Sequence, residues 1–266
     1  MTYRLPPFTR KHLPGLLFGG LLATPAWADD TTLDKVQVVG ARVTEASAAI
    51  GEDRISNTLA ISHEALLSAP AGTSGLKMLE ALPGFNVQVN DALGLYEFGN
   101  SVFVRAFNLQ QIGFSIDGVP LGRSDQFGGS PIYRYVDNEN TQRVTASTGA
   151  GDVTQSGYAS LGPYVDYQTS DPATEPGASL SYTLGSDSLR RSFLRVETGE
   201  YQGLSAYVSR SKIDGDLWRG PGTIDREHLE AKVRYRFGEG NSLWLRAVHN
   251  AFHDFDSPYV SLAQYH

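Results

Sequence analysis

Apolar and polar residues alternate strictly along residues 226–237, whose sequence is REHLEAKVRYRF. A β-strand turns successive side chains to opposite faces, so this period of two predicts a strand with one apolar and one charged face. The apolar face would carry Leu229, Ala231, Val233, Tyr235 and Phe237, and the charged face His228, Glu230, Lys232, Arg234 and Arg236. Residues 179–252 hold about five such runs separated by turn signals, which predicts an antiparallel sheet.

The connections between these runs alternate in length. Residues 199–203 (GEYQG) and 238–241 (GEGN) are short, whereas residues 214–225 (DGDLWRGPGTID) are long. Strands of about ten residues joined in this way are typical of an outer-membrane barrel whose apolar face meets lipid. About five strands do not close such a barrel, so we expect its start here and further strands after His266. A water-soluble sheet with one face on a core is the alternative.

Residues 43–172 show the pattern of a small α+β domain. Ser62 is placed to begin a helix over residues 62–69, and Ser74 to cap a second helix that Pro83 and Gly84 end. Strands are expected at residues 85–89, 101–106, 111–116 and 143–147, with a tight turn at Asp117-Gly118. We place a domain boundary at the spacer of residues 169–178, after which the alternation becomes regular.

The first 28 residues have the layout of a signal peptide. A basic start precedes an apolar run at residues 13–27, and Ala26-Trp27-Ala28 fits a cleavage site. A membrane anchor is the alternative, but the run is short for a bilayer span, which needs about 20 apolar residues. We therefore expect an exported protein.

Charge and composition exclude several classes of partner and site. The chain has 22 Lys and Arg against 29 Asp and Glu, and its formal net charge of −7 becomes −10 without residues 1–28. Nucleic-acid binders neutralise phosphates with basic residues, so we expect no nucleic-acid partner. The absence of cysteine excludes disulfides, thiolate metal sites and a cysteine nucleophile.

No sequence motif of an enzyme is present. The chain lacks the nucleophile-elbow, zinc-protease and phosphate-loop patterns. Asp152 and Asp166 have no recognisable partner, and we do not expect His249 and His253 to share a face. We therefore predict that the protein is not an enzyme and has no metal site or cofactor of its own.

Five segments follow one another in an order that is informative as a whole. They are LDKVQVVGAR (33–42), LEALPGFNVQ (79–88), VFVRAFNLQQIGFSIDGVPLG (102–122), QRVTASTGAGDV (142–153) and SGYASLGPYVDYQTS (156–170). With the signal peptide before them and the alternating strands after them, they resemble the N-terminal part of a TonB-dependent outer-membrane receptor. The resemblance covers essentially the whole chain.

The resemblance implies a fold and a division into domains. The fold is an α+β plug domain followed by the first ~5 antiparallel strands of a transmembrane β-barrel, of which about 22 strands are expected in all. The signal peptide would be residues 1–28, the TonB-box segment 29–42, the plug domain 43–172 and the start of the barrel 173–266.

Residues 33–39 would then be the TonB box, which pairs as an added strand with the inner-membrane protein TonB. They are Leu33, Asp34, Lys35, Val36, Gln37, Val38 and Val39. We expect Asp34, Val36 and Val38 to make the specific contacts, with Lys35 and Gln37 facing the other way. The alternative is that this segment is simply the first strand of the plug domain.

The resemblance also implies an energy-coupled receptor in the bacterial outer membrane, with the plug domain and TonB box facing the periplasm. Its cargo would be a large, scarce nutrient, most often an iron–siderophore complex, with haem, cobalamin and oligosaccharides as alternatives. The iron would belong to this ligand, and outer-membrane lipid would surround the barrel. A passive exported binding or adhesion module, or a truncated fragment that does not transport, is the other interpretation.

Ligand capture would fall to loops at residues 91–100 and 122–133. The candidates are Tyr96, Phe98, Arg123, Gln126, Phe127 and Tyr133. Arg123 would suit an anionic ligand. Ordinary solvated loops are the alternative interpretation of the same residues.

Two positions depart from the family's pattern. Arg105-Ala106 stands where the family has Arg-Gly, and Gly162-Pro163 stands where it often has Gly-Gly. Because proline lacks a backbone donor, the last plug strand could pair differently here. Arg105, Asp117 and Gly118 are the residues that we assign to the structural motif of the plug domain.

Overall fold

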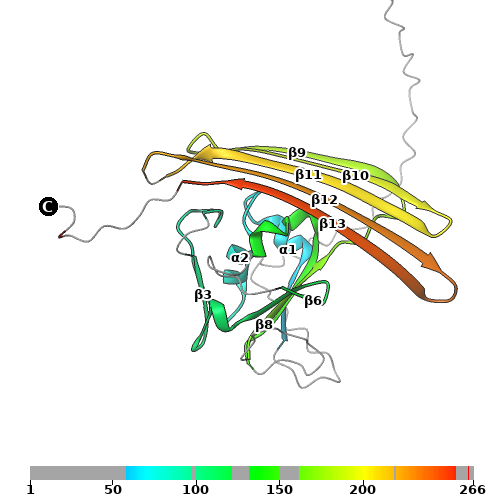
Figure 1. Cartoon of the computed structure of the whole chain (residues 1–266), viewed down its shortest axis with the longest axis horizontal. Helices are drawn as coiled ribbons and strands as arrows, with labels where there is room; N and C mark the ends of the chain where they lie inside the picture. The colour runs from blue at the N-terminus through cyan, green and yellow to red at the C-terminus, as the bar shows by residue number, and fades with distance from the viewer. Residues whose placement is uncertain are drawn as a thin grey trace, which may run out of the picture. The chain divides into compact units, whose positions relative to one another are not determined.

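The computed structural model describes residues 58–96, 100–121, 132–149, 162–218, 220–255 and 263. These residues belong to one unit that runs from Ala41 to His266 (Figure 1). The predicted signal peptide at residues 1–28 and the predicted TonB box at residues 33–39 lie outside the described residues. Within the described part of the chain, no helix combines the length and apolarity needed to cross a membrane.

The N-terminal domain, residues 58–169, begins with two capped helices. Helix α1 (His63–Ser68) starts at Ser62, whose Oγ accepts a hydrogen bond from the Ala65 N–H at 3.3 Å. Helix α2 (Gly75–Met78) starts at Ser74, whose Oγ accepts from the Lys77 N–H at 3.1 Å, and continues into the 3-10 turn η1 (Leu79–Ala81). Both predicted caps are confirmed, because each serine satisfies an N–H that lacks a partner within the helix.

Eight short strands complete the N-terminal domain. Strands β1 (Thr58–Ser62), β7 (Thr141–Ser147), β8 (Tyr164–Thr169), β5 (Gly113–Ile116) and β6 (Val119–Pro120) form one sheet in this order, and β2 (Phe85–Gln88), β3 (Ser101–Val104) and β4 (Phe107–Asn108) form another. Three further 3-10 turns are η2 (Leu109–Gln111), η3 (Ile132–Arg134) and η4 (Asn138–Asn140). The core between the helices and sheets includes Leu66, Leu76, Leu79, Val102, Val144 and Tyr167.

Several predicted strands are shorter than expected, and three short ones, β1, β4 and β6, were missed. Strand β5 begins only at Gly113, because Asn108 caps the turn η2 just before it. Strand β3 ends at Val104, where the chain turns back into β4. Strand β1 was not predicted, since its five residues, TLAIS, end at the helix cap Ser62 and show no clear alternation.

The two departures from the family pattern have simple structural consequences. In the turn between β3 and β4 the positive φ of 56° belongs to Arg105, and Ala106 has none, so no glycine is required at position 106. Pro163 precedes strand β8, which pairs in parallel with β5 and antiparallel with β7. The Pro163 carbonyl accepts a hydrogen bond from the Gly113 N–H at 3.0 Å, so proline does not prevent pairing of this strand.

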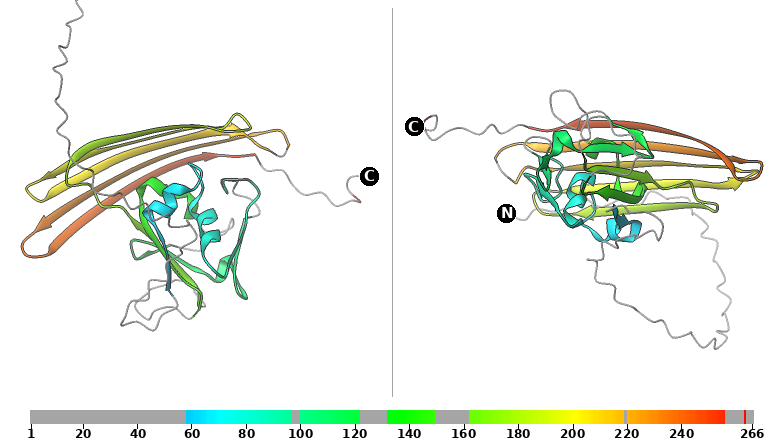
Figure 2. Two further views of the ribbon diagram at one scale, coloured as in Figure 1. Left: turned by 180° about the vertical axis from the view of Figure 1, so that it is seen from behind. Right: turned by 90° about the horizontal axis from the view of Figure 1, so that it is seen from below.

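Residues 176–253 form a second structure, the long sheet. Its strands are β9 (Pro176–Leu184), β10 (Arg190–Tyr201), β11 (Leu204–Asp216), β12 (Thr223–Phe237) and β13 (Asn241–His253), paired antiparallel in chain order. Figures 1 and 2 show these strands side by side in a single curved layer. The prediction of five antiparallel strands is therefore confirmed.

One connection of the long sheet was predicted wrongly. The expected loop at residues 214–225 is shorter, because β11 continues to Asp216 and β12 begins at Thr223. The two short turns are as predicted. In one of them Gly203 has a φ of 82°, and a Cβ added there would lie 2.3 Å from the Arg236 carbonyl oxygen, so the turn requires glycine.

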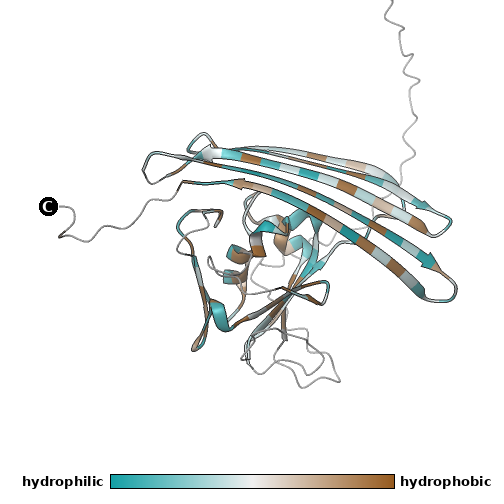
Figure 3. Ribbon diagram, in the orientation of Figure 1, coloured by the Kyte–Doolittle hydropathy of each residue, from teal (hydrophilic) through white to brown (hydrophobic). Residues whose placement is uncertain are grey.

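Figure 3 shows apolar and polar residues alternating along the strands of the long sheet. Their exposure confirms the predicted difference in chemistry between its two faces. On the outer face Leu180, Val208 and Leu245 are 76%, 58% and 72% exposed. On the inner face His228, Glu230 and Lys232 are at most 3% exposed, although all three are polar. The inner face carries polar side chains, and these are buried because the N-terminal domain lies against them.

The structure also corrects two statements about single residues. His249 and His253 both lie on β13 with outward side chains, since residues four apart in a strand share a face. Asp166 has partners, because it accepts hydrogen bonds from the Ser115 hydroxyl and, at 3.0 Å, from the Gly118 N–H. It thereby anchors the Asp117-Gly118 turn, in which both residues have positive φ as predicted for a tight turn.

Candidate functional site: the interface between the two domains

Several described segments of the chain before β9 contact the inner face of the long sheet. They include the turn around η4 at residues 136–141, the end of β8 with the following residues 169–171, and the loop at residues 91–96. The first two make polar contacts, and the third makes apolar contacts. Together they form the candidate functional site, because any movement between the domains must break them.

Asp137 is the most buried carboxylate of the polar contact. Its Oδ1 accepts from Arg226 Nη1 at 2.7 Å, and its Oδ2 accepts from the Ser211 hydroxyl at 2.6 Å. Burial raises the pKa of Asp137, but Arg226, His228 and Arg191 outweigh this effect and hold that pKa well below its usual range. The carboxylate is therefore charged at any physiological pH.

Glu139 and Asn140 continue the contact along the same turn. Arg191 donates to both carboxylate oxygens of Glu139, at 2.7 and 2.9 Å, in a bidentate ion pair. Asn140 donates to the Ser209 hydroxyl at 2.7 Å and accepts from Arg195 Nη1 at 3.1 Å. The turn thus presents two carboxylates and one amide to strands β10, β11 and β12.

The end of β8 forms a second polar contact. Lys232 Nζ donates to the Thr169 hydroxyl at 2.9 Å, and that hydroxyl donates in turn to Asp117 at 2.6 Å. Lys232 also pairs with Asp171 at 3.2 Å, and Arg234 donates to the same carboxylate. The Asp117-Gly118 turn is therefore linked through Thr169 to the middle of the long sheet.

Some charges of the inner face are balanced within the sheet itself. Arg246 donates to both carboxylate oxygens of Glu230 at 3.0 Å, and Tyr207 donates to the same carboxylate at 2.6 Å. Arg195 pairs with Glu197 at 2.5 Å, and its guanidinium lies 3.7 Å from the centroid of the Tyr207 ring. These ion pairs lie within the sheet, although Arg195 also donates to Asn140 and Arg246 to the Tyr135 carbonyl at 2.6 Å.

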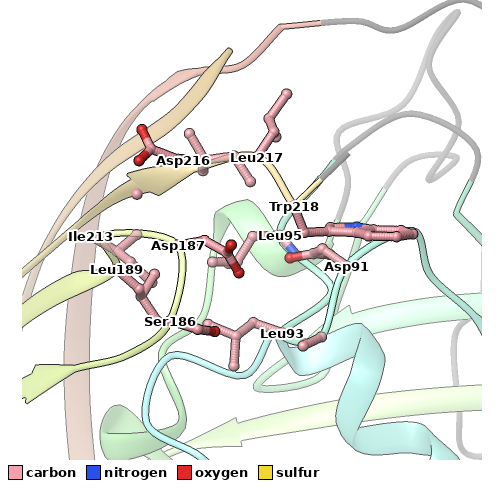
Figure 4. Close-up of a pocket in the computed structure, with 13 residues that line it drawn as sticks. Asp91, Leu93, Leu95, Ser186, Asp187, Leu189, Ile213, Asp216, Leu217 and Trp218 are labelled. Atoms are coloured by element: carbon pink, nitrogen blue, oxygen red, sulfur yellow. The ribbon is translucent and has the colours of Figure 1, made fainter. Parts of the chain in front are cut away.

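The apolar contact lies at the opposite end of strands β11 and β12 from the short turns. Leu95 and Tyr96 pack with Ile213 and Ile224 in a small separate cluster. Figure 4 shows the cavity beside it, of about 110 Å³, between the loop at residues 91–95 and two connections of the long sheet. Leu93, Leu189 and Leu217 line it together with the carboxylates of Asp91, Asp187 and Asp216, and burial raises the pKa of Asp91.

The structure brings together only part of the predicted site. Tyr96, one of the predicted ligand-binding residues, is 9% exposed and packs with Leu95, Ile213 and Ile224. Tyr133 lies in η3. Phe98, Arg123, Gln126 and Phe127 lie outside the described residues, as do the side chain of Tyr133 and the seven residues of the predicted TonB box. Their roles stay predictions.

Arg105, Asp117 and Gly118 have structural positions in the N-terminal domain. Arg105 donates weakly to Thr148 at 3.4 Å, and Asp117 accepts from both the N–H and the hydroxyl of Thr169. Sequence reasoning missed Asp137, Glu139 and Asn140. A signal was present, since this acidic segment, VDNEN, follows a loop and would complement the arginines predicted on the charged face of the strands.

Comparison with known proteins identifies the N-terminal domain. Residues 52–162 match the family model described as the TonB-dependent receptor plug domain. Residues 52–162 are therefore a domain of the TonB-dependent receptor plug type. No curated protein matches the chain in sequence.

Solved receptor structures share the fold of the plug domain together with the long sheet. The ferric-catecholate import receptor Fiu of E. coli K12 matches with a TM-score of 0.59 at 19% identity over 76% of this chain. The pyoverdine outer-membrane receptor FpvA of Pseudomonas aeruginosa PAO1 gives 0.58 at 18% over 72%, and the copper transporter OprC gives 0.59 at 14% over 74%. The matches cover 28%, 27% and 30% of those proteins, so this chain spans less than a third of their length.

Proposed function

We propose that this chain belongs to an energy-coupled outer-membrane receptor that imports a large, scarce nutrient, and that the nutrient is an iron–siderophore complex. The observation that carries the proposal is the docking of a TonB-dependent receptor plug domain on the polar inner face of an amphipathic antiparallel sheet. Such an arrangement blocks a path along the inner face as long as the contacts hold.

The outer face of the long sheet supports a location in the outer membrane. Leu180, Tyr182, Leu243 and Leu245 are more than 60% exposed, and such a group of exposed large apolar side chains is unusual for a surface that meets water. Alternating strands with this face outward are the form in which β-proteins contact lipid. In this arrangement the plug domain and the residues before it face the periplasm.

Energy would enter through residues 33–39. The outer membrane has no nucleotide supply, so work must arrive from a partner at the inner membrane, and TonB is the partner that the family name implies. A short apolar segment joins a partner's sheet by strand addition, in which main-chain hydrogen bonds provide the affinity. Tension on this segment is applied to the plug domain at β1, the first strand that the structure describes.

The proposed cargo rests on two structural relatives, a ferric-catecholate receptor and a pyoverdine receptor. One of the relatives is a copper transporter, so the same fold serves another cargo. Copper is therefore used as the comparison cargo in the uptake experiment. The iron would enter and leave with the ligand. The protein itself acts as a receptor and gate and makes or breaks no covalent bond.

Deletion of residues 33–39 tests this proposal. Cells that express the protein, with and without the deletion, are supplied with radioactive iron as ferric enterobactin or ferric pyoverdine, and with copper. We expect binding at the cell surface to be retained and accumulation to be lost in the deletion variant. Equal accumulation by both proteins would indicate a passive binding module, and no binding of either iron complex would refute the siderophore assignment.

A further inference from the structure

The inner face of the long sheet carries more positive than negative charge. Its described basic residues are Arg191, Arg195, Arg226, Lys232, Arg234, Arg236 and Arg246, and only three acidic partners lie within the sheet. Glu197, Glu200 and Glu230 balance Arg195, Arg236 and Arg246 there. The remaining basic groups depend on carboxylates from other parts of the chain or share one.

Arg191 and Arg226 are the two cations whose carboxylate partners belong to the plug domain. Arg191 pairs with Glu139 and Arg226 with Asp137, both at 2.7 Å. The two arginines lie in one row across the sheet, because Ile213 of β11 is the cross-strand neighbour of both. One displacement of the turn at residues 137–140 therefore removes the countercharge of both.

Lys232 and Arg234 add to this excess further along β12. Both contact the single carboxylate of Asp171, in the connection between β8 and β9. Asp171 lies after the last strand of the plug domain, β8, and shortly before β9, which begins at Pro176. Because one carboxylate neutralises only one of these two cations, one positive charge remains uncompensated even when Asp171 stays in place.

We propose that displacement of the plug domain uncovers a basic strip, centred on Arg191 and Arg226, that favours the passage of anionic cargo. This inference rests on the proposed function, in which the plug domain moves, and it assigns the charge of the cargo. The carboxylates of Asp137 and Glu139 leave with the plug domain, whereas the arginines stay on the sheet. Fixed charge of one sign raises the local concentration of the opposite ion, and rings of Arg and Lys line pores for anions.

The absence of cysteine from the sequence makes a direct test possible, because a single introduced thiol reports on one place. Ser211 is 2% exposed, lies on the inner face two residues from Ile213, and is close in size to cysteine. In the purified Ser211→Cys protein, a thiol reagent reaches this position only when the plug domain leaves the inner face. Urea below the concentration that unfolds the sheet makes this opening frequent.

The measurement compares an anionic methanethiosulfonate reagent (sulfonatoethyl) with a cationic one (trimethylammonioethyl). Each rate is divided by the rate of the same reagent with mercaptoethanol. Both reagents require the same opening, so its equilibrium constant cancels in the ratio of the two rates. We expect the anionic reagent to be favoured by at least about threefold, from the field of two nearby unit charges.

Charge removal on each face provides the variants. Arg191→Gln combined with Arg226→Gln should bring the ratio close to one, and Arg210→Gln, on the outer face of the intervening strand β11, should leave it unchanged. If the double variant folds poorly, Asp137→Asn with Arg226→Gln replaces a buried ion pair by a neutral pair and should lower the ratio relative to Asp137→Asn alone.

Two results would overturn the inference. One is a thiol that never reacts below the unfolding transition, which would mean that this face stays covered. The other is a ratio that is near one in the Ser211→Cys protein or insensitive to Arg191 and Arg226. Neither result depends on TonB or on a cargo. The inference can therefore fail while deletion of residues 33–39 still abolishes uptake, and it can hold while that deletion has no effect on uptake.

Discussion

Arg226 of strand β12 and Asp137 of the plug domain form an ion pair of 2.7 Å in which the side chains are only 5% and 4% exposed. Removing one partner of such a pair leaves the other charge buried without compensation, which destabilises a protein by about 3–5 kcal/mol. We expect Asp137→Ala to lower the stability of the plug–sheet contact by about this amount. Urea unfolding of the purified protein in detergent, followed by fluorescence, measures the change.

Arg210 and Glu227 supply the matched control for this prediction. They form an ion pair of 2.6 Å between β11 and β12, but on the outer face, and Arg210 is 51% exposed. Exposed pairs contribute about 0–1 kcal/mol. Arg210→Ala should therefore change stability by less than about 1 kcal/mol, and an effect as large as that of Asp137→Ala would mean that burial is not what strengthens the inner pair.

The plug–sheet contact should weaken in acid. The pKa of Asp137 is lower in the folded protein than its ordinary value of 3.8. The contribution of this carboxylate to the stability of the contact is therefore fully present above pH 3.8 and is lost as the pH falls below that value. The urea midpoint should thus be constant near neutral pH and decrease in strong acid. In Asp137→Asn this part of the decrease should be missing, and an identical pH profile in both proteins would contradict the assignment.

Position 105 should tolerate glycine better than position 106. Arg105 has a φ of 56°, a conformation that costs a residue with a Cβ about 1–2 kcal/mol, whereas Ala106 has an ordinary φ. Arg105→Gly should therefore stabilise the plug domain by up to about 1 kcal/mol, and Ala106→Gly should destabilise it by about 0.5–1 kcal/mol. Thermal unfolding of the two variants checks the order, and the reverse order would refute this account of the turn.

Gly75→Ala should destabilise the plug domain although alanine is the better helix former. A Cβ at Gly75 would lie 2.7 Å from Val136 Cγ2 and 3.1 Å from Tyr167 Cε1, and the Tyr167 hydroxyl donates to the Gly75 carbonyl at 2.7 Å. Overpacking of this kind costs about 1–3 kcal/mol. Gly177→Ala is the control, since nothing lies within 4 Å of a Cβ there, and its stability should change by less than about 0.5 kcal/mol.

The sequence predicted the parts of this structure that depend on local pattern. The capping serines at positions 62 and 74, the turn at Asp117-Gly118 and the two faces of β12 follow from interactions within a few residues. Element ends were predicted less well. Strand β11 runs to Asp216 through Gly215 because β12 pairs with it there, and pairing with a distant strand leaves no signal in a local window.

The candidate site was the least predictable part. Asp137 becomes important only because the fold sets it against Arg226, which is 89 positions away in sequence. The prediction instead gave weight to aromatic residues in loops. One of them, Tyr96, is buried against Ile213 and Ile224, which is again a contact between residues far apart in the sequence. What the sequence did contain was the charge of both surfaces, the acidic turn and the basic strand face, but not their pairing.

The central claim is that the plug domain must leave the inner face of the long sheet for the receptor to work. Asn140 Nδ2 and Ser209 Oγ are 2.7 Å apart across this contact, so cysteines at both positions face each other and a short bis-methanethiosulfonate reagent can join them. Uptake of the ferric siderophore should stop in the cross-linked Asn140→Cys, Ser209→Cys protein, return after reduction, and continue in either single variant treated with the same reagent. Uptake at the wild-type rate by fully cross-linked protein would contradict the account.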